Sequence, residues 1–185
     1  MVNTHPNVRP ENADYLQTKN AKLGHRLPLE ADVREGGPIR FYHSDQPWGE
    51  LSNFSRHAVF IADRVWPTVE HYYQAQKFAG TVHEETIRRC ATPTQAKREA
   101  TALQAERTRG DWAEVKEAVM LRGLRAKFLQ HPDLAQRLLS SGARRLVEHT
   151  SNDAYWGDAG DGTGQNRLGH LLMQVRAELG ALAPH

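Results

Sequence analysis

The chain has 185 residues, which is enough for one well-packed domain and short for two. It carries 24 basic and 22 acidic residues, so its net charge of +2 excludes a general polyanion-binding signature. Cys90 is the single cysteine, and the sequence has neither a secretory signal nor a bilayer-length apolar run, so we expect a cytoplasmic protein without disulfides, cysteine-rich metal site or membrane partner.

The N-terminal part, residues 1–37, is polar, has balanced charge and shows little periodicity. Three prolines and a Gly-Gly-Pro sequence at 36–38 punctuate it. This composition predicts a loosely packed N-terminal extension, followed by one folded domain over residues 38–182.

Short strands are predicted near the start of the domain and once near its end. Residues 39–42 alternate as a strand does, residues 57–61 and 64–66 read as a hairpin turning at Ala62-Asp63, and residues 145–149 form a late strand. Ser44 to Asn53 reads as a loop between the first two strands.

Helices account for most of the remaining chain. Thr68, Thr92 and Asp111 are predicted N-caps, and Gly80 and Gly142 are predicted helix stops. The predicted helices cover residues 68–79, 83–90, 92–105, 111–130, 131–141 and 165–179. Because no regular strand–helix alternation occurs, the predicted fold class is α+β, a mostly helical single domain with a small β-sheet.

The predicted helix within residues 66–78 carries the side chains that most clearly suggest a catalytic role. Glu70, Tyr73, Gln74 and Lys77 stand at i, i+3, i+4 and i+7, so they share one face. A carboxylate and an amine two turns apart, flanked by aromatic and amide groups, fit an acid/base and nucleophile pair. The alternative is a helix with a surface ion pair.

A second unusual stretch runs from Ser151 to Gly157 and continues into a loop with glycines at 160, 162 and 164. Asp153 lies just before Trp156. It could act as an acid beside aromatic residues, or it could simply form a turn. The glycines and the following helix start suit either phosphate binding or a plain flexible loop, and the nearby aspartates oppose phosphate.

Three tryptophans stand where an indole face could be offered to a flat base: Trp48 in a loop, Trp112 at a helix start and Trp156 beside the glycines. Asn53 adds an amide that could read such a base. The ten histidines are scattered and show no metal-binding spacing, and His71 is interpreted as structural.

The order of these segments resembles the NADAR (YbiA-like) family of N-glycosidases. The matching segments are Phe41-Tyr42, L-S-N-F at 51–54, W-P-T-V-E-H-Y-Y-Q-A-Q-K-F at 66–78, Lys127-Phe128, L-V-E at 146–148, S-N-D-A-Y-W-G at 151–157 and G-Q-N-R-L-G-H-L-L-M at 164–173. The resemblance implies cleavage of a ribose C1–nitrogen bond without cofactor or metal. The implied substrates are ADP-ribosylated guanine, including that in DNA or RNA, and the phosphoribosylamino-pyrimidine intermediates of riboflavin biosynthesis.

Site residues follow from this resemblance and from the residue chemistry together. The expected catalytic residues are Glu70, Lys77, Trp112 and Asp153. The expected substrate-binding residues are Trp48, Asn53, Tyr73, Gln74, Trp156, Gly157 and Asn166.

Two chemical routes and one rival class stay open. Lys77 can form a Schiff base with C1 that water later hydrolyses, or Glu70 and Asp153 can assist direct hydrolysis with Lys77 as an electrostatic partner. Desolvation among aromatic side chains would favour the neutral amine that the first route needs. The rival class is a non-catalytic module that binds ADP-ribose or a nucleotide.

Overall fold

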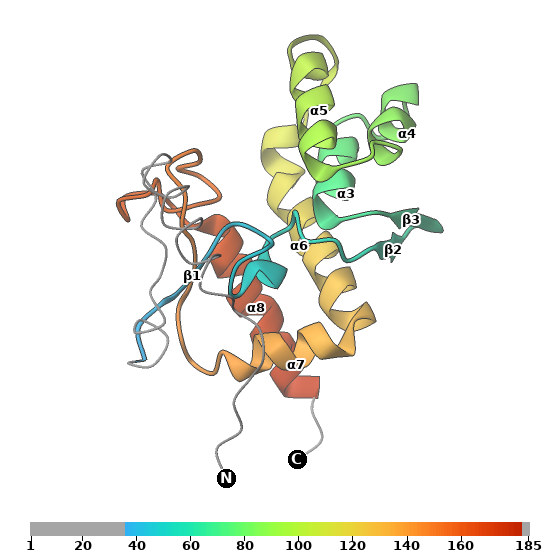
Figure 1. Ribbon diagram of the computed structural model, residues 1–185. Helices are drawn as coiled ribbons and strands as arrows, with labels where there is room; N and C mark the ends of the chain where they lie inside the picture. Colours follow the sequence, from blue (N-terminus) through green and yellow to red (C-terminus); the bar gives the residue numbers. More distant parts are fainter. Residues whose placement is uncertain (1–35, 183–185) are drawn as a thin grey trace, which may run out of the picture.

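A computed structural model describes the backbone of residues 36–182 and their side chains except those of residues 104–107 (Figure 1). The predicted extension over residues 1–37 therefore lies almost wholly outside the described residues. In residues 36–182, helices make up most of the fold and strands are short, so the predicted mostly helical α+β class is confirmed.

Six α-helices occur in the described residues, each close to a predicted position. Their bounds are α3 Val69–Gln76, α4 Val82–Arg88, α5 Pro93–Arg107, α6 Trp112–Gln130, α7 Pro132–Ser140 and α8 Arg167–Leu182. Gly80 takes a φ of +79°, and Gly142 a φ of +58°, so both predicted helix stops adopt the left-handed conformation that glycine tolerates.

The strands form two separate pairs in the described part of the chain rather than one small sheet. Strand β1, Ile39–Phe41, pairs in parallel with β4, Leu146–Glu148, and Phe41 lies opposite Glu148. Strand β2, Val59–Ile61, pairs antiparallel with β3, Arg64–Trp66. Ala62 and Asp63 have φ values of 52° and 60°, which gives the predicted hairpin the turn that suits twisted strands. A short 3₁₀ helix, η1 Gly49–Leu51, lies between β1 and β2.

Helix α3 lies among α4, α5 and α6 and packs against all three (Figure 1). It can approach α6 closely because Gly123 has no side chain. A Cβ atom at that position would lie 2.8 Å from Val69 Cγ1 and 3.2 Å from Tyr72 Cδ1. The core residues Trp66, Val69 and Leu124 are each almost fully buried here. This packing holds α3, the helix that carries Glu70, in one rigid position.

Side-chain caps fix where α3 and α5 begin. The Thr68 hydroxyl accepts the His71 N–H at 3.2 Å, and the Thr92 hydroxyl accepts the Gln95 N–H at 3.1 Å, as predicted. His71 is buried between Thr68 and the Cys90 carbonyl, so its predicted structural role is confirmed.

The predicted N-cap position of α6 at Asp111 is confirmed, but the capping hydrogen bond expected from its side chain does not form. Its two carboxylate oxygens instead accept hydrogen bonds from Nε and Nη2 of Arg109, at 2.5 and 2.8 Å. A two-point contact between opposite charges outcompetes one backbone N–H for the same oxygens.

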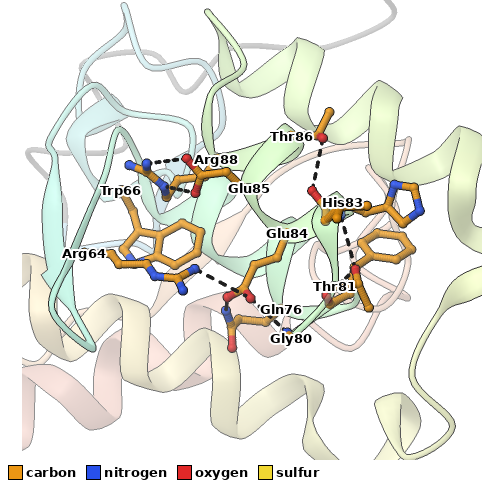
Figure 2. Close-up of polar contacts among 12 residues, drawn as sticks. Arg64, Trp66, Gln76, Gly80, Thr81, His83, Glu84, Glu85, Thr86 and Arg88 are labelled. Carbon is orange, nitrogen blue, oxygen red and sulfur yellow. Dashed lines mark hydrogen bonds and ion pairs between the residues drawn. The ribbon is translucent and has the colours of Figure 1, made fainter.

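The turn that follows α3 is fixed by Glu84 of α4. Figure 2 shows its carboxylate between Arg64, Gln76 and Gly80. Gln76 Nε2 donates to Glu84 Oε1 at 3.0 Å, the Gly80 N–H donates to Oε2 at 2.9 Å, and Arg64 lies 3.7 Å away. These contacts flank Lys77 in the chain, so they fix the backbone that carries its amine.

Candidate functional site

A cavity of about 200 Å³ lies beside α3, where α5, α6, α8 and β4 also contribute side chains. Seven of its lining residues were predicted as site residues and come from three separate segments of the chain: Asn53, Glu70, Tyr73, Gln74, Lys77, Asp153 and Trp156. Glu70, Lys77 and Asp153 therefore line one cavity.

Glu70 is held in place by two amide side chains. Asn53 Nδ2 donates a short hydrogen bond to Oε2, and Gln74 Nε2 donates to Oε1 at 2.7 Å. The Glu70 N–H in turn donates to the Asn53 carbonyl at 2.9 Å, so the loop after η1 and the first turn of α3 are locked together. Burial raises the pKa of the Glu70 carboxyl, while the Gln74 hydrogen bond and the charges of Lys97 and Lys77 oppose that rise.

Lys77 is the C-cap residue of α3, and its amine lies near two aromatic rings. Its side chain is largely covered, at 8% exposure, and Nζ lies 5.8 Å from the ring centroids of both Tyr73 and Trp112. Burial lowers the pKa of the Lys77 amine, and the charge of Glu70 opposes that fall. Among the described side chains of residues 36–103 and 108–182, no carboxylate forms an ion pair with this amine.

Asp153 forms a turn and lines the cavity at the same time. Its Oδ1 accepts the N–H groups of Tyr155 at 2.9 Å and of Trp156 at 2.8 Å. Glu117 of α6 fixes this loop from outside, because it accepts hydrogen bonds from the Tyr155 hydroxyl and from Arg167 Nε. The two interpretations of Asp153, as acid and as turn residue, are therefore compatible.

Trp112 and Trp48, two of the predicted tryptophans, do not line the cavity. Trp112 packs on Tyr73, with ring centroids 5.1 Å apart, and therefore reaches the site through its neighbours. Trp48 is buried, and the Arg137 guanidinium carbon lies 3.6 Å from the centroid of its ring. The Trp48 indole thus has a charged partner inside the protein and is not offered to a base, contrary to the expectation.

Asn166 and Gly157 act on the backbone rather than on the cavity. Asn166 is fully buried, accepts the Glu148 N–H at 2.9 Å and donates to the Leu146 carbonyl at 2.8 Å. A Cβ at Gly157 would lie 2.6 Å from Thr150 Cγ2 and 2.9 Å from the Glu148 carbonyl oxygen. The structure thus places both residues where they support β4 and the loop after it.

The glycine-rich loop is organised around Asp158. Its side chain accepts the N–H groups of Thr150 and Gly160, and its carbonyl accepts those of Gly162 and Gly164. The first N–H groups of α8 donate to the carbonyls of residues 155 and 156. Because these donors are already used, the phosphate-binding interpretation of this loop is not supported.

Two charged lining residues were missed by the sequence prediction. Glu148 ends the buried strand β4, and Lys97 lies on an exposed part of α5. A glutamate at the end of an apolar strand was a usable signal, because charged residues are rarely buried without a function or partner. Lys97 gave no such signal, since its helix reads as an ordinary polar one. The other lining residues not predicted are Phe54, Thr101, Met120 and Leu168.

The described side chains, which exclude those of residues 104–107, contain no group of three or more His, Cys, Asp or Glu placed to hold a metal ion. Nor does any helix in the described part of the chain combine the length and apolar character needed to cross a membrane.

Known proteins resemble this chain over nearly all of the described residues. The NADAR domain matches residues 40–180. N-glycosidase YbiA of Escherichia coli is 47% identical over 157 residues, which cover 83% of this chain and 98% of that protein. A riboflavin biosynthesis protein of Vibrio vulnificus is 43% identical over 148 residues, covering 80% of this chain and 40% of that protein. The solution structure of E. coli YbiA matches with a TM-score of 0.75 and 42% identity, covering 87% of this chain and 92% of that one.

Proposed function

This chain belongs to the NADAR family and acts as a hydrolase of N-glycosyl bonds, and we propose that the bond it breaks joins C1 of a ribose phosphate to a base nitrogen. The two substrate groups are ADP-ribosylated guanine, free or in DNA or RNA, and the phosphoribosylamino-pyrimidines of riboflavin biosynthesis. The relative from Vibrio vulnificus that is named a riboflavin biosynthesis protein favours the second group.

The observation that carries this proposal is the convergence of Glu70, Lys77 and Asp153 on one cavity. Its volume of about 200 Å³ lies below the roughly 300–1,000 Å³ of sites that enclose a whole drug-sized ligand. The cavity therefore suits the sugar, with base and phosphate extending toward its opening. Lys97, exposed on α5 at the cavity, is a suitable cation for the phosphate.

The polar groups of the cavity suit a ribose in particular. Gln74 uses its amide nitrogen on Glu70, and its Oε1 is buried without a hydrogen-bond partner in the described part of the chain. A ribose hydroxyl would supply the missing donor. Asn53, Tyr73 and Trp156 complete the proposed substrate contacts, and Trp112 acts by packing on Tyr73 and beside Lys77.

The covalent route proceeds through Lys77. The ring oxygen leaves C1 and takes a proton, which gives an iminium between C1 and the base nitrogen. The neutral Lys77 amine adds to C1, the C1–base bond breaks, and the base leaves with the bond's electron pair and one proton. Water then hydrolyses the remaining imine to the sugar aldehyde and the amine. Glu70, as a carboxylate, stabilises positive charge at C1, and Asp153 is placed to take a proton from the water.

Direct hydrolysis and simple binding make different predictions. In direct hydrolysis, Lys77 acts only as a charge and never bonds to the sugar. A binding module for ADP-ribose would hold the ligand and release nothing.

Parallel incubations with ADP-ribosylated guanine DNA and with phosphoribosylamino-pyrimidines test the function, with the released base measured by mass spectrometry. We expect release from at least one substrate group, and its loss in Glu70→Gln and Asp153→Asn. Binding to both substrates without any release would overturn the assignment.

Borohydride added during turnover tests the covalent route. It should reduce the imine and add the sugar mass to the peptide that contains Lys77. An unmodified peptide under conditions of confirmed turnover would favour direct hydrolysis.

A further inference from the structure

Three carboxyl groups, those of Glu70, Glu148 and Asp153, line the same cavity. Negative charges on carboxylates that share one site repel each other, so a proton on one of them relieves that repulsion. The leaving base nitrogen needs a proton in either chemical route. The carboxyl that keeps a proton is therefore the natural candidate for the acid.

Hydrogen bonding separates the three groups. Both oxygens of Glu70 accept N–H donors from side-chain amides, and Oδ1 of Asp153 accepts two backbone N–H groups. Such donors stabilise negative charge on these oxygens. Glu148 differs, because its Oε2 is buried and accepts no hydrogen bond in the described part of the chain.

The cavity as a whole has too few donors. Among the described side chains, those of residues 36–103 and 108–182, the buried nitrogen and oxygen atoms without a partner are Gln74 Oε1 and Glu148 Oε2, and both are acceptors on residues that line this cavity. A proton on Glu148 converts one of these acceptors into a donor group and removes an unstabilised charge.

Charged groups face Glu148 from several sides. Glu70 and Lys77 belong to α3 and its end, Lys97 to α5, and Asp153 and Asp158 to the loop after β4. The charges of Asp153, Glu70 and Asp158 add to burial and raise the pKa of the Glu148 carboxyl to about 8, while Lys97 opposes them. His149, its neighbour in the chain, is engaged with Asp158 Oδ2 at 2.8 Å.

The backbone of Glu148 is unusually well fixed for a strand end. Its N–H donates to buried Asn166, its carbonyl accepts the Asp158 N–H at 2.9 Å, and it lies opposite Phe41 of β1. Only 8% of the residue is exposed. The backbone of an acid in this position is already fixed at the cavity, so no loop movement is needed to bring the acid to the substrate.

We propose that Glu148 is the general acid of the reaction: its carboxyl group gives a proton to the base nitrogen as the C1–nitrogen bond breaks. The electron pair of that bond and the Glu148 proton leave with the base. Hydrolysis of the sugar intermediate by water releases one net proton, which Asp153 takes first and which then returns to the Glu148 carboxylate, so the cycle balances. This inference rests on the proposed function and assigns the proton to a residue other than Glu70 and Asp153.

Variants of Glu148 test this role kinetically. Glu148→Gln keeps the shape but has no acidic proton, so kcat should fall roughly 100- to 10,000-fold, with little change in KM. In the wild type, kcat should decline above pH 8, and this limb should be absent from the residual activity of Glu148→Gln. Glu148→Asp should restore both part of the rate and the alkaline limb. A Glu148→Gln variant with wild-type kcat, or with raised KM and unchanged kcat, would overturn the assignment.

A titration of the wild-type protein separates this inference from the function itself. ¹³C nuclear magnetic resonance of glutamate side-chain carboxyls follows Glu148, identified by its absence in Glu148→Gln, without any substrate. A midpoint near 8 supports the assignment, and a midpoint at or below its ordinary value of 4.5 overturns it. If the wild type releases no base from either substrate group, the proposed function fails, while this titration still reports where the proton lies.

Discussion

Replacing Lys127 by methionine tests how the fold positions the site. Lys127 of α6 is fully buried and does not line the cavity, and its Nζ donates to the Glu50 carbonyl, to the Ser52 carbonyl at 2.9 Å and to the Ser55 hydroxyl at 2.6 Å. These three acceptors flank Asn53, whose amide holds Glu70. The lysine therefore anchors the loop that orients the proposed carboxylate.

The magnitude applies below the lowered pKa of about 7, where the Lys127 amine is protonated and has three N–H donors, and it follows from the contacts that methionine cannot make. Each buried acceptor left without a donor costs about 1–3 kcal/mol, so three of them cost roughly 3–9 kcal/mol. Removing a buried ammonium returns several kcal/mol of desolvation free energy, which leaves a net destabilisation of about 2–4 kcal/mol. A loop displaced by as little as about 1 Å would also misplace Asn53, and we expect kcat to fall about 100-fold.

Urea denaturation and steady-state kinetics measure the two effects. Arg125→Met on the same helix is the matched control, because Arg125 is 46% exposed in its side chain and pairs with Glu178 at the surface. That control should lose at most about 1 kcal/mol and keep its kcat. A Lys127→Met protein that matches the control in stability and in kcat would refute the anchoring argument.

The pH dependence gives a second signature of Lys127. Burial lowers the pKa of its amine from 10.5 to about 7, so between those values the unfolded chain binds a proton that the folded chain does not. The wild-type free energy of unfolding should therefore gain from this group as pH rises from about 7 to 10.5. Lys127→Met should lack this contribution, which urea titrations at several pH values would measure.

Three further predictions concern residues around the cavity. The raised pKa of Glu148 lets the folded state hold a proton that the unfolded state has lost. The contribution of Glu148 to the free energy of unfolding should therefore decline from about pH 4.5 to 8, and Glu148→Gln should flatten that decline in urea titrations. Gly169→Ala should lose about 1–3 kcal/mol in the same assay, since a Cβ there would lie 2.2 Å from the Leu146 carbonyl oxygen. Asn53→Ala should lower kcat while Trp48→Phe leaves it within about twofold, because only Asn53 lines the cavity and holds Glu70; equal losses would contradict this placement.

Sequence by itself determined the features that depend on neighbouring residues. Helix positions, the caps at Thr68 and Thr92 and the hairpin turn at Ala62-Asp63 all follow from local backbone geometry. The shared face of Glu70 and Lys77 is of the same kind, because helical periodicity alone brings residues seven apart to one side. These parts of the site were therefore predictable without any knowledge of tertiary contacts.

Tertiary structure decided which distant groups meet that face. Pairing of β1 with β4 brings Glu148 to the cavity, and the loop after β4 brings Asp153, while Arg137 packs over Trp48, which does not line the cavity. Such contacts depend on how helices and strands pack across long separations in the chain, and a single sequence does not encode that packing in any local pattern. The pKa of Glu148 belongs to the same class, because its burial and its charged neighbours exist only once the chain has folded.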